Sequence, residues 1–150
     1  MRDKEFETIF GQIPTESDCY QVIADASRAD GQKVVRSDKV RAYEHAFMQQ
    51  CVKYANRQIL GQFRLLINFY MEKDCKDIGN AIRTVLGCLQ ITKAVADKGK
   101  CSELIVRKVT DVTYPRIEFV IQEMAEPMDI AALSDFLSRE SVSTSKGGKL

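Results

Sequence analysis

The chain has 150 residues, of which 45 % are hydrophobic and 29 % charged, with a formal net charge of +1. These values are ordinary for one soluble globular domain, and the absence of a run of about 18 apolar residues excludes a membrane-spanning helix. The charged N-terminal residues have no apolar stretch behind them, so we expect a cytoplasmic protein rather than a secreted one.

The small net charge hides a segregation of charge along the chain. Residues 1–38 carry 5 basic and 8 acidic side chains, residues 39–100 carry 11 and 5, and residues 101–150 carry 6 and 8, which gives net charges of −3, +6 and −2. A cationic middle between acidic flanks fits a surface that binds a polyanion. It fits equally well flanks that fold back and neutralise the middle.

The first part of the chain predicts two short helices and a link. The first helix spans Arg2–Phe10 and ends at the glycine that follows. The second spans about Glu16–Arg28, because a capping pattern of small hydroxyl and acidic residues stands at its start. Asp30-Gly31 is a turn signal, and Lys33–Arg36 is either a very short strand or an extended link.

The central prediction is one long amphipathic helix over Ser37–Asp74, with Ser37 or Asp38 as its N-cap. At 100° per residue, a wide apolar face runs from Val40 to Phe69. Gly61 weakens this helix, but the apolar phase continues across it, which favours a bend rather than an end.

The opposite face of this helix carries a row of cations without an acid before Glu72. At 1.5 Å per residue the row is about 38 Å long. Charged rows are usually solvated faces. Regularly spaced cations along a rod also match the phosphates of a nucleic acid. The residues of the row are Lys39, Lys53, Arg57 and Arg64.

Another helix is predicted over Cys75–Asp97, antiparallel to the long helix Ser37–Asp74, with Asp74 as its N-cap. Its apolar side includes Val85 and Leu89, and two cations, Arg83 and Lys93, lie away from that side and add to the positive middle of the chain.

After this helix, the hydrophobic pattern changes from a period of 3.6 residues, typical of a helix, to a period of 2 residues, typical of a strand. Two alternating segments, Glu103–Val112 and Arg116–Glu123, predict a β-hairpin over about residues 103–123. Pro127 begins a final short helix that runs to about Ser138. Residues 140–150 are small and polar and predict a disordered tail.

Together these elements predict an α+β fold that is mostly helical. We expect one globular domain over residues 1–139, with an antiparallel helical core, a C-terminal β-hairpin and a final short helix.

The sequence has no motif for a catalytic site, a metal or a cofactor. There is no Gly-rich phosphate loop and no nucleophile elbow. The five cysteines are widely spaced and the chain has one histidine, His45, so buried free thiols fit better than a metal site. Cys51 and His45 point in different directions on the predicted helix. Tyr43 and Tyr54 lie at the edge of its basic face, where they either stack on bases or cap the core.

Two functions follow from these observations. One is a non-catalytic subunit of a larger assembly that binds RNA or DNA through phosphates, with contacts from Lys39, Lys53, Arg57, Arg64, Arg83 and Lys93. The other is a protein–protein adaptor or a homo-oligomeric structural protein, in which the basic row pairs with the acidic flanks. We expect neither an enzyme nor a cofactor, and no membrane partner.

Overall fold

The computed structural model describes residues 6–15, 19–72, 78–110, 112–124, 131 and 133–138. Over these residues, strands outweigh helices. The elements in chain order are β1 (Glu7–Phe10), β2 (Tyr20–Ala24), β3 (Gln32–Arg36), α1 (Asp38–Gln50), β4 (Phe63–Tyr70), α2 (Gly79–Ile91), the 3₁₀ turn η3 (Lys98–Lys100), β5 (Cys101–Val109) and β6 (Arg116–Glu123). Residues 131 and 133–138 are also helical.

The centre of the fold is a four-stranded sheet in the order β1-β6-β4-β5. β4 runs parallel to β5 and antiparallel to β6, and β6 runs antiparallel to β1. Every residue of β4 is buried. A strand that is covered on both faces has a nearly continuous apolar sequence rather than an alternating one, and β4 is such a strand.

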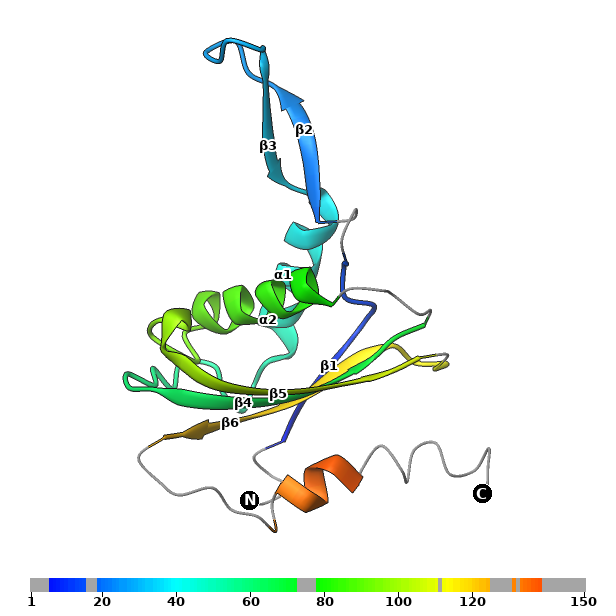
Figure 1. The fold of residues 1–150 in the computed structure, drawn as a ribbon, viewed down its shortest axis with the longest axis vertical. Coiled ribbons are helices and arrows are strands. Elements are labelled where there is room, and N and C mark those ends of the chain that lie inside the picture. Colours follow the sequence, from blue (N-terminus) through cyan, green and yellow to red (C-terminus); the bar gives the residue numbers. More distant parts are fainter. Residues whose placement is uncertain are drawn as a thin grey trace.

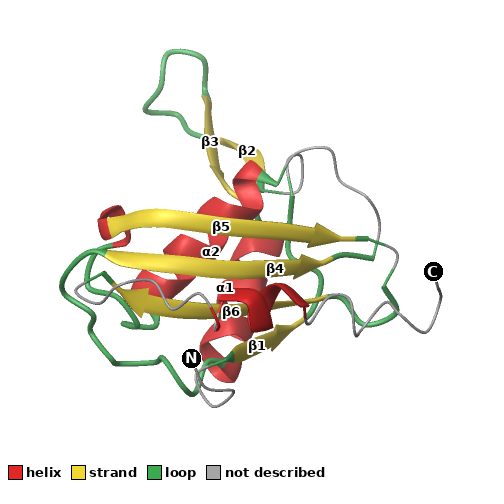
Figure 2. Ribbon diagram, turned by 60° about the horizontal axis from the view of Figure 1, so that its bottom comes forward, coloured by secondary structure: helices red, strands yellow, loops and turns green. Residues whose placement is uncertain are grey.

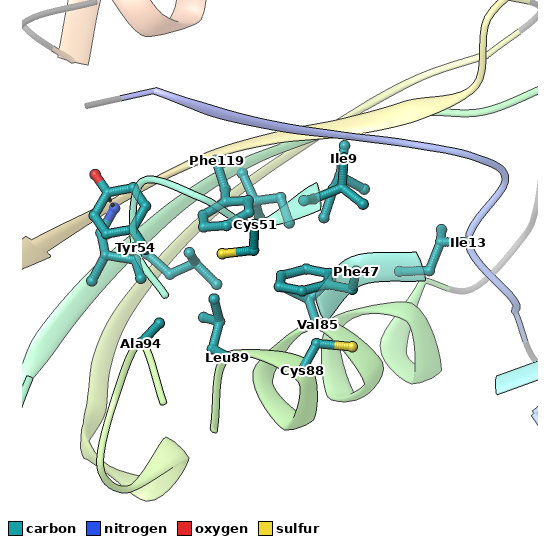
Figure 3. Packing of buried hydrophobic residues seen from close by; sticks show 14 of the residues in the cluster. Ile9, Ile13, Phe47, Cys51, Tyr54, Val85, Cys88, Leu89, Ala94 and Phe119 are labelled. Carbon is teal, nitrogen blue, oxygen red and sulfur yellow. Dashed lines mark hydrogen bonds between the residues drawn. The ribbon is translucent and has the colours of Figure 1, made fainter. Parts of the chain in front are cut away.

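The two helices α1 and α2 cover one face of this sheet (Figures 1 and 2). The main apolar core lies between them and the sheet (Figure 3). Its centre is the stacked pair of Phe47 from α1 and Phe119 from β6, with ring centroids 5.8 Å apart. Tyr54 packs on the same Phe119 ring at 5.7 Å, and its hydroxyl oxygen accepts a hydrogen bond from the backbone N–H of Ile121 at 3.3 Å.

The helical residues 131 and 133–138 lie on the other face of the sheet (Figure 1). Phe136 is fully buried there, 6.2 Å from Phe6 in an edge-to-face contact, and packs with Leu66 and Val120. The prediction of a last helix is confirmed at residues 131 and 133–138, and the residues after Ser138 that would show its predicted end are not described. Its predicted start at Pro127 and the predicted tail at residues 140–150 lie outside the described residues.

A separate two-stranded hairpin of β2 and β3 projects from the body next to the start of α1 (Figure 1). The predicted turn at Asp30-Gly31 lies in the loop 25–31 that joins its strands, and Gly31 has a positive φ of 70°, a conformation that favours glycine. The strand alternative for Lys33–Arg36 is confirmed. The helix predicted over Glu16–Arg28 is wrong where the chain is described, because β2 occupies that segment.

The mostly helical fold class is also wrong. The helix predicted over Ser37–Asp74 is two elements, α1 and β4. The predicted cap is confirmed, since the Ser37 hydroxyl accepts from the backbone N–H of Val40 at 3.2 Å. After Gln50, however, Asn56 and Gln58 adopt positive φ values of 65° and 53°, which no right-handed helix accommodates.

The remaining helix and hairpin predictions need similar corrections. The segment predicted as the helix Arg2–Phe10 contains β1. The Cys75–Asp97 helix is shorter, because α2 ends at Ile91 and Lys93 has a φ of 63°. The strands of the predicted 103–123 hairpin both exist, but they do not pair with each other, since β4 lies between them.

Candidate nucleic-acid interface

The cations of the predicted row do not share one face of one helix. Lys39 lies on the exposed side of α1, and Lys53 and Arg57 are exposed in the segment that follows α1. Arg64 lies in β4, Arg83 is exposed on α2, and Lys93 is exposed just after α2. A continuous rod of phosphate contacts is therefore ruled out, and each residue has to be judged in its own surroundings.

Arg64 is held inside the sheet. The residue is only 4 % exposed, its Nε lies 2.5 Å from the Glu103 carboxylate on β5, and it donates to the Gln122 side chain on β6 at 3.0 Å. The guanidinium thus bridges the three neighbouring strands β5, β4 and β6. A phosphate would have to displace these bonds, so we leave Arg64 out of the interface.

Three of the predicted cations, Lys53, Arg57 and Lys93, lie in the segments that follow α1 and α2. The segments 56–59 and 92–96 are joined by backbone hydrogen bonds, among them Gln58 N–H to the Lys93 carbonyl at 2.9 Å. Arg57 lies over the Tyr54 ring at 4.6 Å, and the Lys53 ammonium donates to the Phe6 carbonyl at 2.5 Å. Two of these three side chains thus contribute to packing or hydrogen bonding within the protein.

Arg83 lies in different surroundings, in a shallow hollow of about 110 Å³ between the base of the hairpin, α2 and η3. At about 30 Å³ per water molecule, this volume holds a few waters or a small anionic group. We call it the cationic hollow, and the lining residues that matter below are Tyr20, Arg36, Asn80, Arg83, Thr84 and Lys98.

All the charged side chains that line the cationic hollow, among described residues, are basic. Its lining includes Arg36, Arg83 and Lys98 and, among described residues, no carboxylate. Arg36 forms an ion pair with Glu44 of α1, yet half of its side chain remains exposed, at 51 %. Arg83 donates to the neutral Asn80 side chain at 3.0 Å. Within the described residues, neither Arg83 nor Lys98 has an ion-pair partner.

Of the two alternatives for Tyr43 and Tyr54, stacking on bases or capping the core, the structure supports the place at the core. Tyr43 and Tyr54 are 6 % and 1 % exposed, so they belong to the core and do not offer their ring faces to a base. Tyr20 is 46 % exposed and lines the cationic hollow. Sequence reasoning missed Tyr20, Arg36 and Lys98. The pattern that points to the first two is the alternation of Tyr20, Val22, Val34 and Arg36 about the Asp30-Gly31 turn.

The cysteines that the structure describes and the histidine lie apart from the cationic hollow, except Cys19, which belongs to its lining. Among the described residues, no three His, Cys, Asp or Glu side chains gather where they could hold a metal ion. Cys51 and Cys88 are buried, and burial raises the pKa of both thiols, that of Cys51 to about 12. His45 is exposed on α1.

No family model and no curated protein matches this chain, so the functional argument depends on the residues described above. Within the described part of the chain, none of the helices combines the length and the apolar character needed to cross a bilayer. The cytoplasmic location stays a prediction.

Proposed function

We propose that this protein binds the phosphate backbone of a nucleic acid at the cationic hollow, as a non-catalytic subunit of a larger assembly. The observation that carries the proposal is the convergence of Arg36, Arg83 and Lys98 from three different elements on one concave surface. Cations scattered over a surface are generally solvated, whereas cations that converge on one hollow produce a focused positive potential.

Phosphate chemistry fits these side chains. An arginine fork donates two parallel hydrogen bonds to phosphate oxygens, and a lysine supplies a point charge. Arg83 and Lys98 also sit on rigid elements, the middle of α2 and the turn η3, whose start is capped by the Asp97 carboxylate. Their positions therefore need little ordering when a phosphate binds, and such preorganisation favours affinity.

The hollow is also more suitable than the other cationic cluster, which comprises Lys53, Arg57 and Lys93. In that cluster, Lys53 and Arg57 make contacts with the Phe6 carbonyl and the Tyr54 ring, which a phosphate contact would compete with. We therefore propose Arg83 and Lys98 as the main contacts, with the half-exposed Arg36, which is paired with Glu44, as a supporting contact. Lys39, Lys53, Arg57 and Lys93 are at most peripheral contacts.

Binding of labelled mixed-sequence RNA and DNA oligonucleotides, measured by fluorescence anisotropy over a range of salt concentrations, tests the proposal. Three phosphate contacts correspond to a log–log salt slope of about −2.7 for duplex DNA and about −2.1 for a single strand. The double variant Arg83→Glu with Lys98→Glu should lose binding at low salt while keeping its circular dichroism spectrum.

The matched control is Arg57→Glu with Lys93→Glu, which changes the net charge by the same amount in the other cationic cluster. We expect it to weaken binding only slightly, through the general field of the protein. If the control loses binding and the hollow variant keeps it, the interface lies in the segments that follow α1 and α2 instead. No binding by the wild type at low salt would reject nucleic acid as the partner.

The adaptor function remains the second candidate, because the projecting hairpin carries exposed apolar residues. Val22 and Val34 are paired across its strands and are 60 % and 65 % exposed. Uncovered valines on a two-stranded ribbon are suited to contact with another surface. Light scattering of the wild type and of Val22→Thr with Val34→Thr tests this candidate: a dimer that the double variant disrupts would favour it.

A further inference from the structure

Tyr20 differs from the other tyrosines that the structure describes. Tyr43, Tyr54 and Tyr70 are between 1 % and 6 % exposed, and Tyr114 is 71 % exposed on the turn before β6. Tyr20 alone among these combines an exposure of 46 % for the residue with a place in the lining of the cationic hollow. Its ring is held on a strand, directly across from Arg36 in the β2–β3 register.

The neighbours of Tyr20 continue its surface. In an antiparallel pair, directly opposite residues point to the same face, and so do residues two apart on one strand. The Val22–Val34 pair therefore lies on the same face of the hairpin as Tyr20 and Arg36. This face is apolar and exposed toward the turn and cationic at its base, where Arg83 borders the hollow.

A ring beside cations is suited to a nucleotide whose base is unstacked. Every base has a π-face that stacks on an aromatic side chain, and the adjoining phosphates are then held by arginine and lysine. In a duplex, the base faces are covered by neighbouring base pairs, so Tyr20 has nothing to stack on. The single-stranded form thus uses both features of the hollow, and the duplex uses only its charge.

We propose that the cationic hollow selects single-stranded nucleic acid, with one unpaired base stacked on the Tyr20 ring and its phosphates on Arg83 and Lys98. This inference rests on the proposed function and names its substrate class. The apolar pair Val22–Val34 lies next to that base and excludes water from its edge. Recognition of this kind tolerates any base, since stacking does not read hydrogen-bonding groups.

The test compares Tyr20→Ala, Tyr20→Phe and the control Tyr114→Ala on single strands and duplexes of equal length and sequence. We expect Tyr20→Ala to lower the affinity for the single strand roughly 5- to 150-fold and to leave duplex affinity unchanged. Tyr20→Phe keeps the ring and should keep the affinity. Tyr114→Ala removes an exposed tyrosine outside the hollow and should change neither affinity.

A spectroscopic arm reports stacking directly. The chain contains no tryptophan, so Tyr20→Trp and Tyr114→Trp each create a single emitter. Addition of an unlabelled single strand should quench the emission at position 20 and leave that at position 114 unchanged. Because the Tyr20 side chain is outside both apolar clusters, these variants are expected to fold.

The outcomes separate this inference from the proposed function. If the charge reversal at Arg83 and Lys98 abolishes binding but Tyr20→Ala binds the single strand as the wild type does, base stacking is overturned and phosphate binding stands. Equal loss on single strand and duplex, or a Tyr20→Phe variant as weak as Tyr20→Ala, also overturns it. If the charge reversal changes nothing, both fail together.

Discussion

The carboxylate of Glu7 on β1 accepts a hydrogen bond from the backbone N–H of Lys53 at 2.7 Å, although the two residues are 46 positions apart. The same oxygen lies 3.3 Å from the backbone nitrogen of Tyr54, which also donates to it. Glu7 is only 3 % exposed. A buried acid from the first strand thus binds the segment where α1 has ended, and it helps direct the chain away from a helical path toward β4.

We therefore expect Glu7→Ala to destabilise the protein by about 2–3 kcal/mol, because it leaves two backbone donors without their charged acceptor. Glu7→Gln keeps one acceptor oxygen and should cost about half as much. Urea denaturation followed by circular dichroism measures both. The exposed Glu123 at the end of β6 provides the control: Glu123→Ala should stay within about 0.5 kcal/mol of the wild type. An effect of Glu7→Ala as small as that of the control would contradict this account of the loop.

The ion pair of Arg64 and Glu103 gives a second prediction. Arg64 is buried and the Glu103 side chain is 45 % exposed, so solvent screens the carboxylate of the pair more than the guanidinium. Glu103→Ala leaves a buried guanidinium with Gln122 as its remaining described partner, and we expect a loss of about 1–2 kcal/mol, less than for a fully buried pair. Thermal unfolding measures this loss.

The same pair also separates stability from binding. Arg64→Leu removes a cation that the sequence pattern assigned to the phosphate row, yet in the structure this cation faces only protein groups. Its nucleic-acid affinity at fixed salt should therefore equal that of the wild type, once folding is confirmed. A marked loss of affinity in a folded Arg64→Leu protein would return Arg64 to the interface.

The segment that forms β4 was predicted as part of a helix, which shows that a local hydrophobic pattern does not always distinguish a helix from a strand. Phe63–Tyr70 is buried on both faces of the sheet, so it lacks the alternation that identified Arg116–Glu123 correctly. A continuous apolar run fits a helical wheel as well as it fits a central strand, and its length alone did not decide between them. The polar cap at Ser37 was predictable because its partner lies only three residues away.

The candidate site was predictable only in part for the same reason. Arg83 was recognised as a cation on the outer side of a helix, which is where it lies. The cationic hollow, which makes Arg83 a candidate contact, also requires Tyr20 and Arg36 at the base of the hairpin and Lys98 beyond α2. Their convergence depends on how the hairpin meets the helix, which is a tertiary contact that no spacing along the chain encodes.

The buried thiol of Cys51 predicts a pH dependence of stability. Burial, with the nearby Glu7 carboxylate as the second cause, raises its pKa from about 9 to about 12. Between these values the unfolded chain releases the proton and the folded chain keeps it. The stabilisation is therefore complete below pH 9 and is lost as the pH rises toward 12, at up to about 1.4 kcal/mol per pH unit.

Denaturation of wild type and Cys51→Ala at several pH values from 8 to 10.5 measures this effect. Burial raises the pKa values of Cys88 and Tyr43 in the same direction, so both proteins should lose stability with rising pH. The variant should lose it less steeply, because one titrating group has been removed. Parallel curves would show that Cys51 ionises in the folded state as readily as in the unfolded chain.

The salt dependence of binding tests the role of Arg83 most directly. Each phosphate contact that a cation makes with a single strand releases counterions and contributes about −0.7 to the slope of log K against log salt concentration. Arg83→Gln should therefore make the slope less steep by about 0.7, with weaker binding to every sequence alike. Arg41→Gln is a matched control, since Arg41 is also exposed on a helix but already pairs with Asp38 at 2.5 Å. A slope that changes equally in both variants, or in neither, would mean that Arg83 acts through the net charge of the protein and makes no contact of its own.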